Sequence, residues 1–312
     1  MRRAAFRQSF LELRMFNIGE GEAVLVTFPN RTCWLFDAGV GTHPSPHRRL
    51  GGLLIDLLEA NETTLTHCVA SHPHSDHVGA FATIFGSDSP NIRRPLRVFR
   101  TDEEWFRPER VWKDVYHGAT GVGVTETVIV DDSHLEPVDA DSSVFLFAGS
   151  GQGDYTSLFA QIRFRKARIL FTGDAECLYE DQLLQQVGVA SLRGDVLKIT
   201  HHGSSSGTKQ TVVDAAIQPA ICIASTAHDE DHTLEADTLQ RLGGFDGPRD
   251  ILETVSDGDL ILRTDGHPYR RSGTLWDVKF DSPGGFAASF SNTDIVNRDD
   301  VQRRTGNPTH CG

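Results

Sequence analysis

Residues 72–77 of this 312-residue chain read His-Pro-His-Ser-Asp-His and place three imidazoles and one carboxylate within six positions. Both side-chain types bind divalent metal ions, and this spacing carries far more weight than a lone histidine. Residues 65–70 before the hexapeptide are rich in β-formers, which predicts a buried strand that ends where the ligands begin. The sequence therefore predicts a metal centre at one edge of a sheet.

The hexapeptide also has a predictable local conformation. Pro73 keeps the residue before it extended, so the two histidines that flank it can project to the same side. Ser75 or Asp76 is a suitable N-cap for a helix over about residues 77–85. Asp76 and His77 are then expected to face the metal from the first helical turn.

Two later strands are predicted to end in further ligand-type side chains. Residues 166–174 end in Thr-Gly-Asp, where the glycine permits a sharp turn and brings the Asp174 carboxylate to the strand end. A carboxylate that bridges two ions is expected at this position. Residues 195–204 end in His-His-Gly-Ser, and at least one of His201 and His202 should be a ligand.

Two other residues are expected beside the ligands. Residues 34–39 predict a third strand, and Asp37 at its end is better placed to accept a hydrogen bond from a ligand imidazole than to bind metal itself. His232 begins a predicted helix that runs through Leu242, and it could contact substrate.

In their order along the chain, these motifs resemble those of the metallo-β-lactamase fold. Residues 17–26, residues 196–204 and His232 before its helix resemble more closely the hydrolase domain of ComEC-type competence proteins and their free-standing soluble relatives. The resemblance covers roughly residues 12–265. It implies an α/β (α+β sandwich) fold with four αββα layers.

The resemblance also implies a site for two divalent ions, with zinc the first expectation and manganese the second. The implied ligands are His72, His74, Asp76, His77, Asp174 and His201. His72 and His74 would hold the first ion, Asp174 would bridge the two, and His201 would complete the second. His202 would then lie behind the ligands or contact substrate.

The chain departs from the family pattern in two places. Many members have another histidine before the bridging aspartate, but residues 151–157 contain none, and Asp154 could substitute for it. The relatives usually have Gly-Gln-Gly-Asp where residues 19–22 read Gly-Glu-Gly-Glu, which leaves the role of Glu22 open.

Two neighbouring ions fit the hydrolysis of a phosphodiester of DNA, RNA or a nucleotide, through attack of a metal-bridging hydroxide. The expected catalytic residues are Asp76, Asp174, His202 and Lys198, and Ser204 or His232 could also donate to the developing charge. The alternatives are hydrolysis of another ester, such as a phosphorylated headgroup, a lactone or a β-lactam, or a degenerate metal-binding interaction module. Fold does not determine substrate, so these alternatives stay open.

Composition limits the class of protein. A net charge of −13 argues against binding of long nucleic acid by counterion release. No apolar run reaches the roughly 20 residues that span a bilayer, and no apolar stretch follows Arg2 and Arg3 as in a signal peptide. Five scattered cysteines are expected to be reduced, which favours a cytoplasmic protein.

The strand and helix patterns alternate without a break in composition, which predicts one hydrolase domain over residues 1–281. Residues 86–142 are expected to form an insertion near the mouth of the site. Residues 282–312 are expected to form a polar C-terminal extension. The sequence makes no prediction of the oligomeric state.

Overall fold

The structure is a computed structural model. It describes residues 10–19, 21–41, 50–101, 123–129, 132–149, 157–227, 233–243 and 249–267, and the backbone of strands 276–281 and 287–289. The predicted site residues Asp154 and His232 lie outside the described residues.

In the described part of the chain, nine strands form one mixed sheet in the order β16-β15-β14-β1-β2-β3-β4-β5-β6. Their bounds are β1 Leu11–Met15, β2 Val24–Thr27, β3 Thr32–Phe36, β4 Thr64–Val69, β5 Ile92–Arg100, β6 Val124–Val128, β14 Asp259–Thr264, β15 Trp276–Asp281 and β16 Ala287–Ser289. Strands β3 to β6 pair in parallel, and the others pair antiparallel.

Seven further strands of the described residues form a second mixed sheet in the order β13-β12-β11-β10-β9-β8-β7. Their bounds are β7 Asp132–Pro137, β8 Ser142–Ala148, β9 Phe159–Phe164, β10 Ala167–Phe171, β11 Val196–Lys198, β12 Ile221–Ala224 and β13 Asp250–Glu253. Strands β10 to β13 pair in parallel, and β7 to β10 pair antiparallel.

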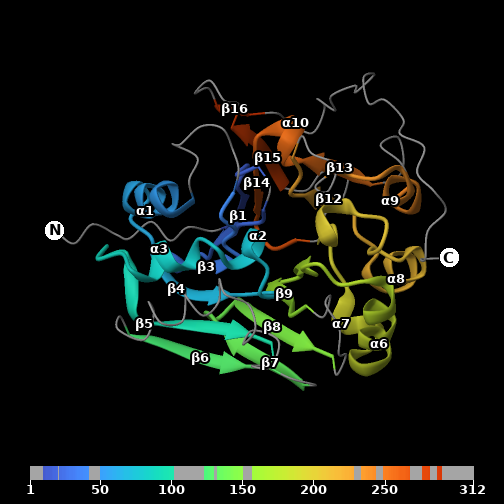
Figure 1. The fold of residues 1–312 in the computed structure, drawn as a ribbon, viewed down its shortest axis with the longest axis horizontal. Coiled ribbons are helices and arrows are strands. Elements are labelled where there is room, and N and C mark those ends of the chain that lie inside the picture. The colour runs from blue at the N-terminus through green and yellow to red at the C-terminus, as the bar shows by residue number, and fades with distance from the viewer. Residues whose placement is uncertain are drawn as a thin grey trace.

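Helices cover the outer face of each sheet (Figure 1). Beside the first sheet lie α1 Leu50–Ala60, α2 Ser75–Val78 and α3 Phe81–Phe85, and beside the second lie α6 Cys177–Val187, α7 Val189–Leu192, α8 Gln210–Val212 and η3 Val213–Ile217. Three short helices complete the described elements: η2 His201–Gly203, α9 Ala236–Arg241 and α10 Thr254–Asp257. A third apolar cluster fills the space between the sheets. This order of layers confirms the predicted αββα sandwich.

The topology explains where the polar residues gather. The carboxyl ends of parallel strands meet at one edge of a sheet, and both sheets contain such a group of strands. Directly beneath this edge, Phe36 of β3 stacks on Phe171 of β10 with ring centroids 4.6 Å apart. The two stacked rings join the sheets immediately before Asp37 and the Thr-Gly-Asp turn that ends in Asp174, so both carboxylates emerge at the same place.

The predicted single helix over residues 77–85 is wrong, because the structure breaks it into α2 and α3 at Gly79 and Ala80. The amide of Ala80 donates to the carbonyl of Ala38 at 2.7 Å, which draws the chain onto the end of β3. A Cβ at Gly79 would lie 2.1 Å from Val40 Cγ2, so the close approach requires glycine. His74, and not Ser75 or Asp76, occupies the N-cap position of α2.

Within residues 86–142, β5 and β6 join the first sheet and β7 joins the second. The expectation that this segment forms an insertion near the mouth of the site stays a prediction. Residues 102–122 and 130–131 of this segment lie outside the described residues. The domain boundary after residue 281 stays a prediction.

Composition predicted that no segment spans a membrane and that the cysteines are reduced. No described helix is both long enough and apolar enough to cross a bilayer. Cys33, Cys68 and Cys222 are buried free thiols. Cys177 is disulfide-bonded, so the expectation that all five cysteines are reduced is wrong.

Candidate metal centre

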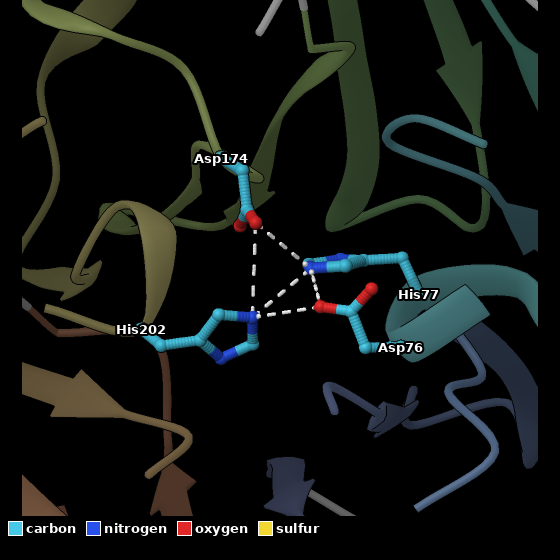
Figure 2. A group of neighbouring side chains, drawn as sticks. All are labelled: Asp76, His77, Asp174 and His202. Carbon is cyan, nitrogen blue, oxygen red and sulfur yellow. Dashed lines mark hydrogen bonds and ion pairs between the residues drawn. The ribbon is translucent and has the colours of Figure 1, made fainter. Parts of the chain in front are cut away.

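Four ligand-type side chains meet at the edge where the parallel strands end: Asp76, His77, Asp174 and His202 (Figure 2). Nε2 of His77 lies 3.2 Å from Nε2 of His202, 3.1 Å from Oδ2 of Asp174 and 3.4 Å from Oδ2 of Asp76. Nε2 of His202 lies 3.3 Å from Oδ2 of Asp76 and 3.7 Å from Oδ2 of Asp174. The four atoms therefore form a compact cluster.

These spacings match the coordination shell of one divalent ion. Zinc binds nitrogen and oxygen at about 2.0–2.1 Å in tetrahedral geometry, which places its ligand atoms about 3.3–3.4 Å from one another. The five distances given above run from 3.1 to 3.7 Å. The cluster thus needs little rearrangement to hold a metal ion.

The hydrogen bonds behind the imidazoles fix which nitrogen carries the proton. Nδ1 of His77 lies 2.8 Å from the carboxylate of Asp37, and Nδ1 of His202 lies 3.0 Å from the carbonyl of Ser225. Both partners only accept hydrogen bonds, so each neutral ring protonates Nδ1 and leaves a lone pair on Nε2. Two lone pairs that face each other at 3.2 Å repel unless a cation or a proton lies between them.

His72 follows the same rule through Ser71. The hydroxyl of Ser71 donates to Asp37 at 2.7 Å, so it can only accept from Nδ1 of His72 at 3.0 Å. Nε2 of His72 is then a lone pair, buried and without a hydrogen-bond partner, 3.7 Å from Oδ2 of Asp174. A buried acceptor of this kind is costly unless it binds a cation. Oδ2 of Asp174 therefore lies within 3.7 Å of Nε2 of His72, His77 and His202.

The two remaining predicted ligands lie nearer the solvent. The ring of His74 packs edge-on against that of His72, with centroids 4.6 Å apart. His201 is a quarter exposed, with Nε2 3.9 Å from Oδ2 of Asp174 and Nδ1 3.1 Å from the hydroxyl of Ser206. The compact cluster contains His202 and not His201.

The electrostatic field at the cluster favours a cation. Burial lowers the pKa of His77, but the carboxylates of Asp174, Asp76 and Asp37 raise it, and the resulting pKa lies well above the ordinary histidine value. Burial raises the pKa of Asp174, but the three neighbouring imidazoles lower it to well below its usual range. Burial lowers the pKa of His72, so this ring is neutral and able to bind metal.

The loop that carries His201 and His202 is strained and held from behind. Both histidines have left-handed backbones, with φ of 49° and 52°, which costs on the order of 1–3 kcal/mol for each residue. Glu180 of α6 accepts hydrogen bonds from the loop at Thr200 Oγ1, Thr208 N and Lys209 N. Arg241 of α9 donates to the carbonyls of Ser205 and Gly207. These buried contacts hold the turn that points His202 into the cluster.

Replacing Asp37 with asparagine should weaken metal binding by about 10–100-fold, the usual cost of losing a partner behind a ligand imidazole. Asparagine cannot accept from Ser71 N, Ser71 Oγ and His77 Nδ1 together, as the carboxylate does. The measurement is a chelator competition titration. The exposed Asp56→Asn on α1 serves as the matched control. Equal affinities in the two variants would contradict the predicted role of Asp37.

The buried carboxyl of Glu180 predicts a pH-dependent stability. Burial raises its pKa from 4.5 to about 6, against hydrogen bonds from Lys209, Thr208 and Thr200 that lower it. The folded chain thus binds this proton more tightly than the unfolded chain, so the stabilisation is fully present below pH 4.5 and is lost as the pH rises through about 6. The free energy of unfolding of the wild type relative to Glu180→Gln should fall by about 2 kcal/mol over that window.

This experiment uses metal-free protein in urea at several pH values, because metal binding is itself pH-dependent. The exposed Glu59→Gln is the control and should show no such window. A stability difference between wild type and Glu180→Gln that does not change with pH would contradict the prediction.

Two predicted donors to the reacting phosphate have other partners in the structure. Lys198 is fully buried, where its ammonium pairs with Glu22 and donates to the carbonyl of Gly173 at 3.1 Å. The hydroxyl of Ser204 lies 3.3 Å from that of Ser206.

The sequence reasoning did not identify several residues that support the site: Ser71, Ser157, Glu180, Ser225 and Arg241. Ser71 directly precedes the hexapeptide, which was an available signal. Glu180 could also have been found from the sequence, because it is a carboxylate on the apolar face of α6 between Cys177 and Leu183. Ser157 Oγ accepts a hydrogen bond from Asp174 N at 3.0 Å, and the Ser225 carbonyl accepts from His202. No local sequence pattern predicts either contact.

The family comparison matches residues 18–246 to the Metallo-beta-lactamase superfamily. No curated protein matches the sequence at a significant level. Among solved structures, the metallo-beta-lactamase fold protein YhfI from Bacillus subtilis is similar with a TM-score of 0.51 and 13% identity, over 81% of this chain and 99% of YhfI. A variant of CmlA beta-hydroxylase gives 0.51 and 14%, over 81% of this chain and 54% of its own.

A diphosphatase from the PhnP family gives a TM-score of 0.47 and 15% identity, over 81% of this chain and 96% of its own. At these identities, the two likenesses with a TM-score of 0.51 show the fold alone. The two mixed sheets and the ordered motifs agree with the family match, which spans most of the sequence. The chain belongs to the metallo-beta-lactamase superfamily.

Proposed function

We propose that this chain is a dinuclear-metal-dependent phosphodiesterase or nuclease that hydrolyses DNA, RNA or a nucleotide. The observation that carries the proposal is the position of Asp174. Its Oδ2 lies 3.1 Å from Nε2 of His77 and 3.7 Å from Nε2 of His72, two imidazoles that belong to different ligand sets. A carboxylate oxygen close to both ligand sets can bridge a pair of neighbouring ions.

The ligand sets divide around this carboxylate. We assign the first ion to His72, His74 and Asp174. The second ion is assigned to Asp76, His77, Asp174 and His202, in place of the predicted His201. The mixture of imidazole and carboxylate suits zinc, and manganese is the second choice.

In hydrolysis, the chain's own residues orient the ligands and leave one side of the site open to substrate. When bound, two divalent ions lower the pKa of a shared water and stabilise the charge that develops on the phosphate. The Ser71 hydroxyl, the Asp37 carboxylate and the Ser225 carbonyl accept from Nδ1 of His72, His77 and His202, which orients each ring with its Nε2 lone pair toward the site. Asp76 and His201 each expose a quarter of the side chain, whereas His77 and His202 expose at most 2%. Substrate is therefore expected to enter beside Asp76 and His201.

The choice of a phosphodiester rests on the resemblance to ComEC-type hydrolase domains, which we propose as the branch of this chain. It is supported by the His-His-Gly-Ser sequence of residues 201–204. The net charge of −13 favours a short or single-stranded substrate over long duplex DNA. Since CmlA beta-hydroxylase has a similar fold, the fold alone does not decide the reaction.

The test is a turnover panel. Metal-stripped protein is reloaded with zinc or with manganese and incubated with single-stranded DNA, RNA and cyclic dinucleotides, and in parallel with a lactone and a β-lactam. Chelated protein and the Asp174→Asn variant are the controls. The proposal expects metal-dependent cleavage of at least one phosphodiester. Cleavage of only the lactone or the β-lactam, or of nothing by protein that holds both ions, would overturn it.

A further inference from the structure

Lys198 and Glu22 form a buried ion pair that spans the two halves of the metal centre. Lys198 ends β11 in the second sheet, and Glu22 lies two residues before β2 in the first. Their side chains are 0% and 2% exposed, and the ammonium contacts the carboxylate directly. Removing two charges from water carries a desolvation penalty of several kcal/mol for each ion, which their attraction offsets only when the geometry is good and further polar contacts are made.

The remaining contacts of Lys198 point toward Asp174. Its ammonium donates to the carbonyl of Gly173 at 3.1 Å and lies 3.6 Å from Oδ1 of Asp174. The ammonium thus contacts the Glu22 carboxylate and the Gly173 carbonyl, and its separation from Oδ1 of Asp174 is too long for a hydrogen bond. Because its side chain is fully buried, Lys198 is not available to a substrate that enters from solvent.

The two oxygens of Asp174 consequently lie in different surroundings. Oδ2 faces the imidazoles of His72, His77 and His202. Oδ1 is buried, has no hydrogen-bond partner and is nearest to the positive charge of Lys198. A rotation that exchanged the two oxygens would be resisted by that charge on one side and by the imidazoles on the other.

Glu22 extends the connection to the hexapeptide. Its backbone amide donates to the carbonyl of Asp76 at 2.8 Å, and its carbonyl accepts from Gly39 at 2.9 Å. A Cβ at Gly39 would lie 1.9 Å from the Asp76 carbonyl oxygen, which shows how closely these segments pack. The backbone of Glu22 thus contacts the segment that contains Asp76. Its carboxylate contacts Lys198, which lies beside Asp174.

We propose that Glu22 and Lys198 act as a positioning pair that holds Asp174 with Oδ2 toward both ions and fixes the spacing between the two ligand sets. This inference rests on the dinuclear site of the proposed function, but not on the identity of its substrate. It assigns a role to Glu22 and replaces the predicted role of Lys198 as a donor to the phosphate. A buried pair that only joined the sheets would affect stability and leave metal binding unchanged.

The test compares Lys198→Met, Glu22→Gln and the double variant with wild type, using cobalt(II) as the probe metal. The readouts are cobalt affinity by chelator competition, the visible absorption spectrum of bound cobalt, and urea unfolding of the metal-free protein. The cross-strand pair Glu12–Arg263, which joins β1 and β14, provides the control variants Glu12→Gln and Arg263→Met.

We expect Lys198→Met and the double variant to bind cobalt about 10–100-fold more weakly than wild type, with an altered spectrum. The double variant should unfold at a higher urea concentration than either single variant, because no buried charge is left unpaired. The controls should keep the wild-type affinity and spectrum. If a single variant fails to fold, the double variant still supplies the decisive measurement.

Wild-type affinity and spectrum in the double variant would overturn the positioning role. If the wild type binds cobalt but its metal-loaded form cleaves no phosphodiester, the proposed function is overturned. The positioning role is then still decided by the cobalt affinity and spectrum of the variants. A wild type that binds no cobalt at all would overturn both.

Discussion

Replacing Asp174 with asparagine is expected to abolish the metal-dependent activity, with a fall in turnover on the order of 1,000-fold or more. Loss of a group that merely supports a ligand costs about 10–100-fold, and in the proposed site Asp174 is a ligand of both ions. Its Oδ2 lies within 3.7 Å of His72, His77 and His202. Asparagine keeps the size of the side chain but removes the charge and one acceptor oxygen.

The same variant should bind fewer than two ions, measured as metal content after gel filtration. Its fold should persist, because Asp174 N still donates to Ser157 Oγ and the Phe36–Phe171 stack below is untouched. The exposed Asp56→Asn should match wild type in both measurements. Two tightly bound ions together with substantial turnover in Asp174→Asn would rule out its bridging role.

Much of the metal centre was predictable because its residues occupy strand ends. Short apolar strands followed by Asp37, Asp174 or His202 are visible in the sequence, and parallel strands bring their carboxyl ends to one edge. The sequence likewise indicated that Asp37 would accept a hydrogen bond from a ligand imidazole, and it lies 2.8 Å from Nδ1 of His77.

The contacts that join the two sheets were not predictable. Glu22 and Lys198 are far apart in the sequence, and each taken alone reads as a solvated charge. Their pairing depends on how two separate sheets pack, which no local pattern reports. For this reason Lys198 was predicted to face a substrate, whereas the structure places it behind Asp174. The break between α2 and α3 has a similar cause, since it depends on the contact between Ala80 and the end of β3.

The choice between His201 and His202 also could not be made from the sequence. In a regular strand, adjacent side chains point to opposite faces. If β11 continued through residues 201 and 202, this alternation would show which of the two histidines faces the metal. The structure instead turns both residues into the left-handed region. The direction of each ring then depends on the contacts that hold the turn, including those from Glu180 and Arg241.

Alanine substitutions at these two neighbouring positions should therefore have very different effects. His202→Ala removes a ligand atom from the compact cluster and leaves the Ser225 carbonyl without its partner. It should lose one bound ion and reduce turnover on the order of 1,000-fold, more than the 10–100-fold typical of a supporting residue. His201→Ala should retain both ions, because His201 lies outside that cluster, and should reduce turnover by roughly 10-fold at most.

Each variant is the control for the other, since both relieve one strained backbone position in the same turn. Metal content, cobalt absorption and turnover of the phosphodiester found by the substrate panel would be measured on both proteins side by side. The reverse order, with His201→Ala losing an ion and His202→Ala keeping two, would return the ligand role to His201. It would also mean that the loop over residues 200–209 rearranges when metal binds, because Nε2 of His201 lies 3.9 Å from Oδ2 of Asp174 and a quarter of its side chain is exposed.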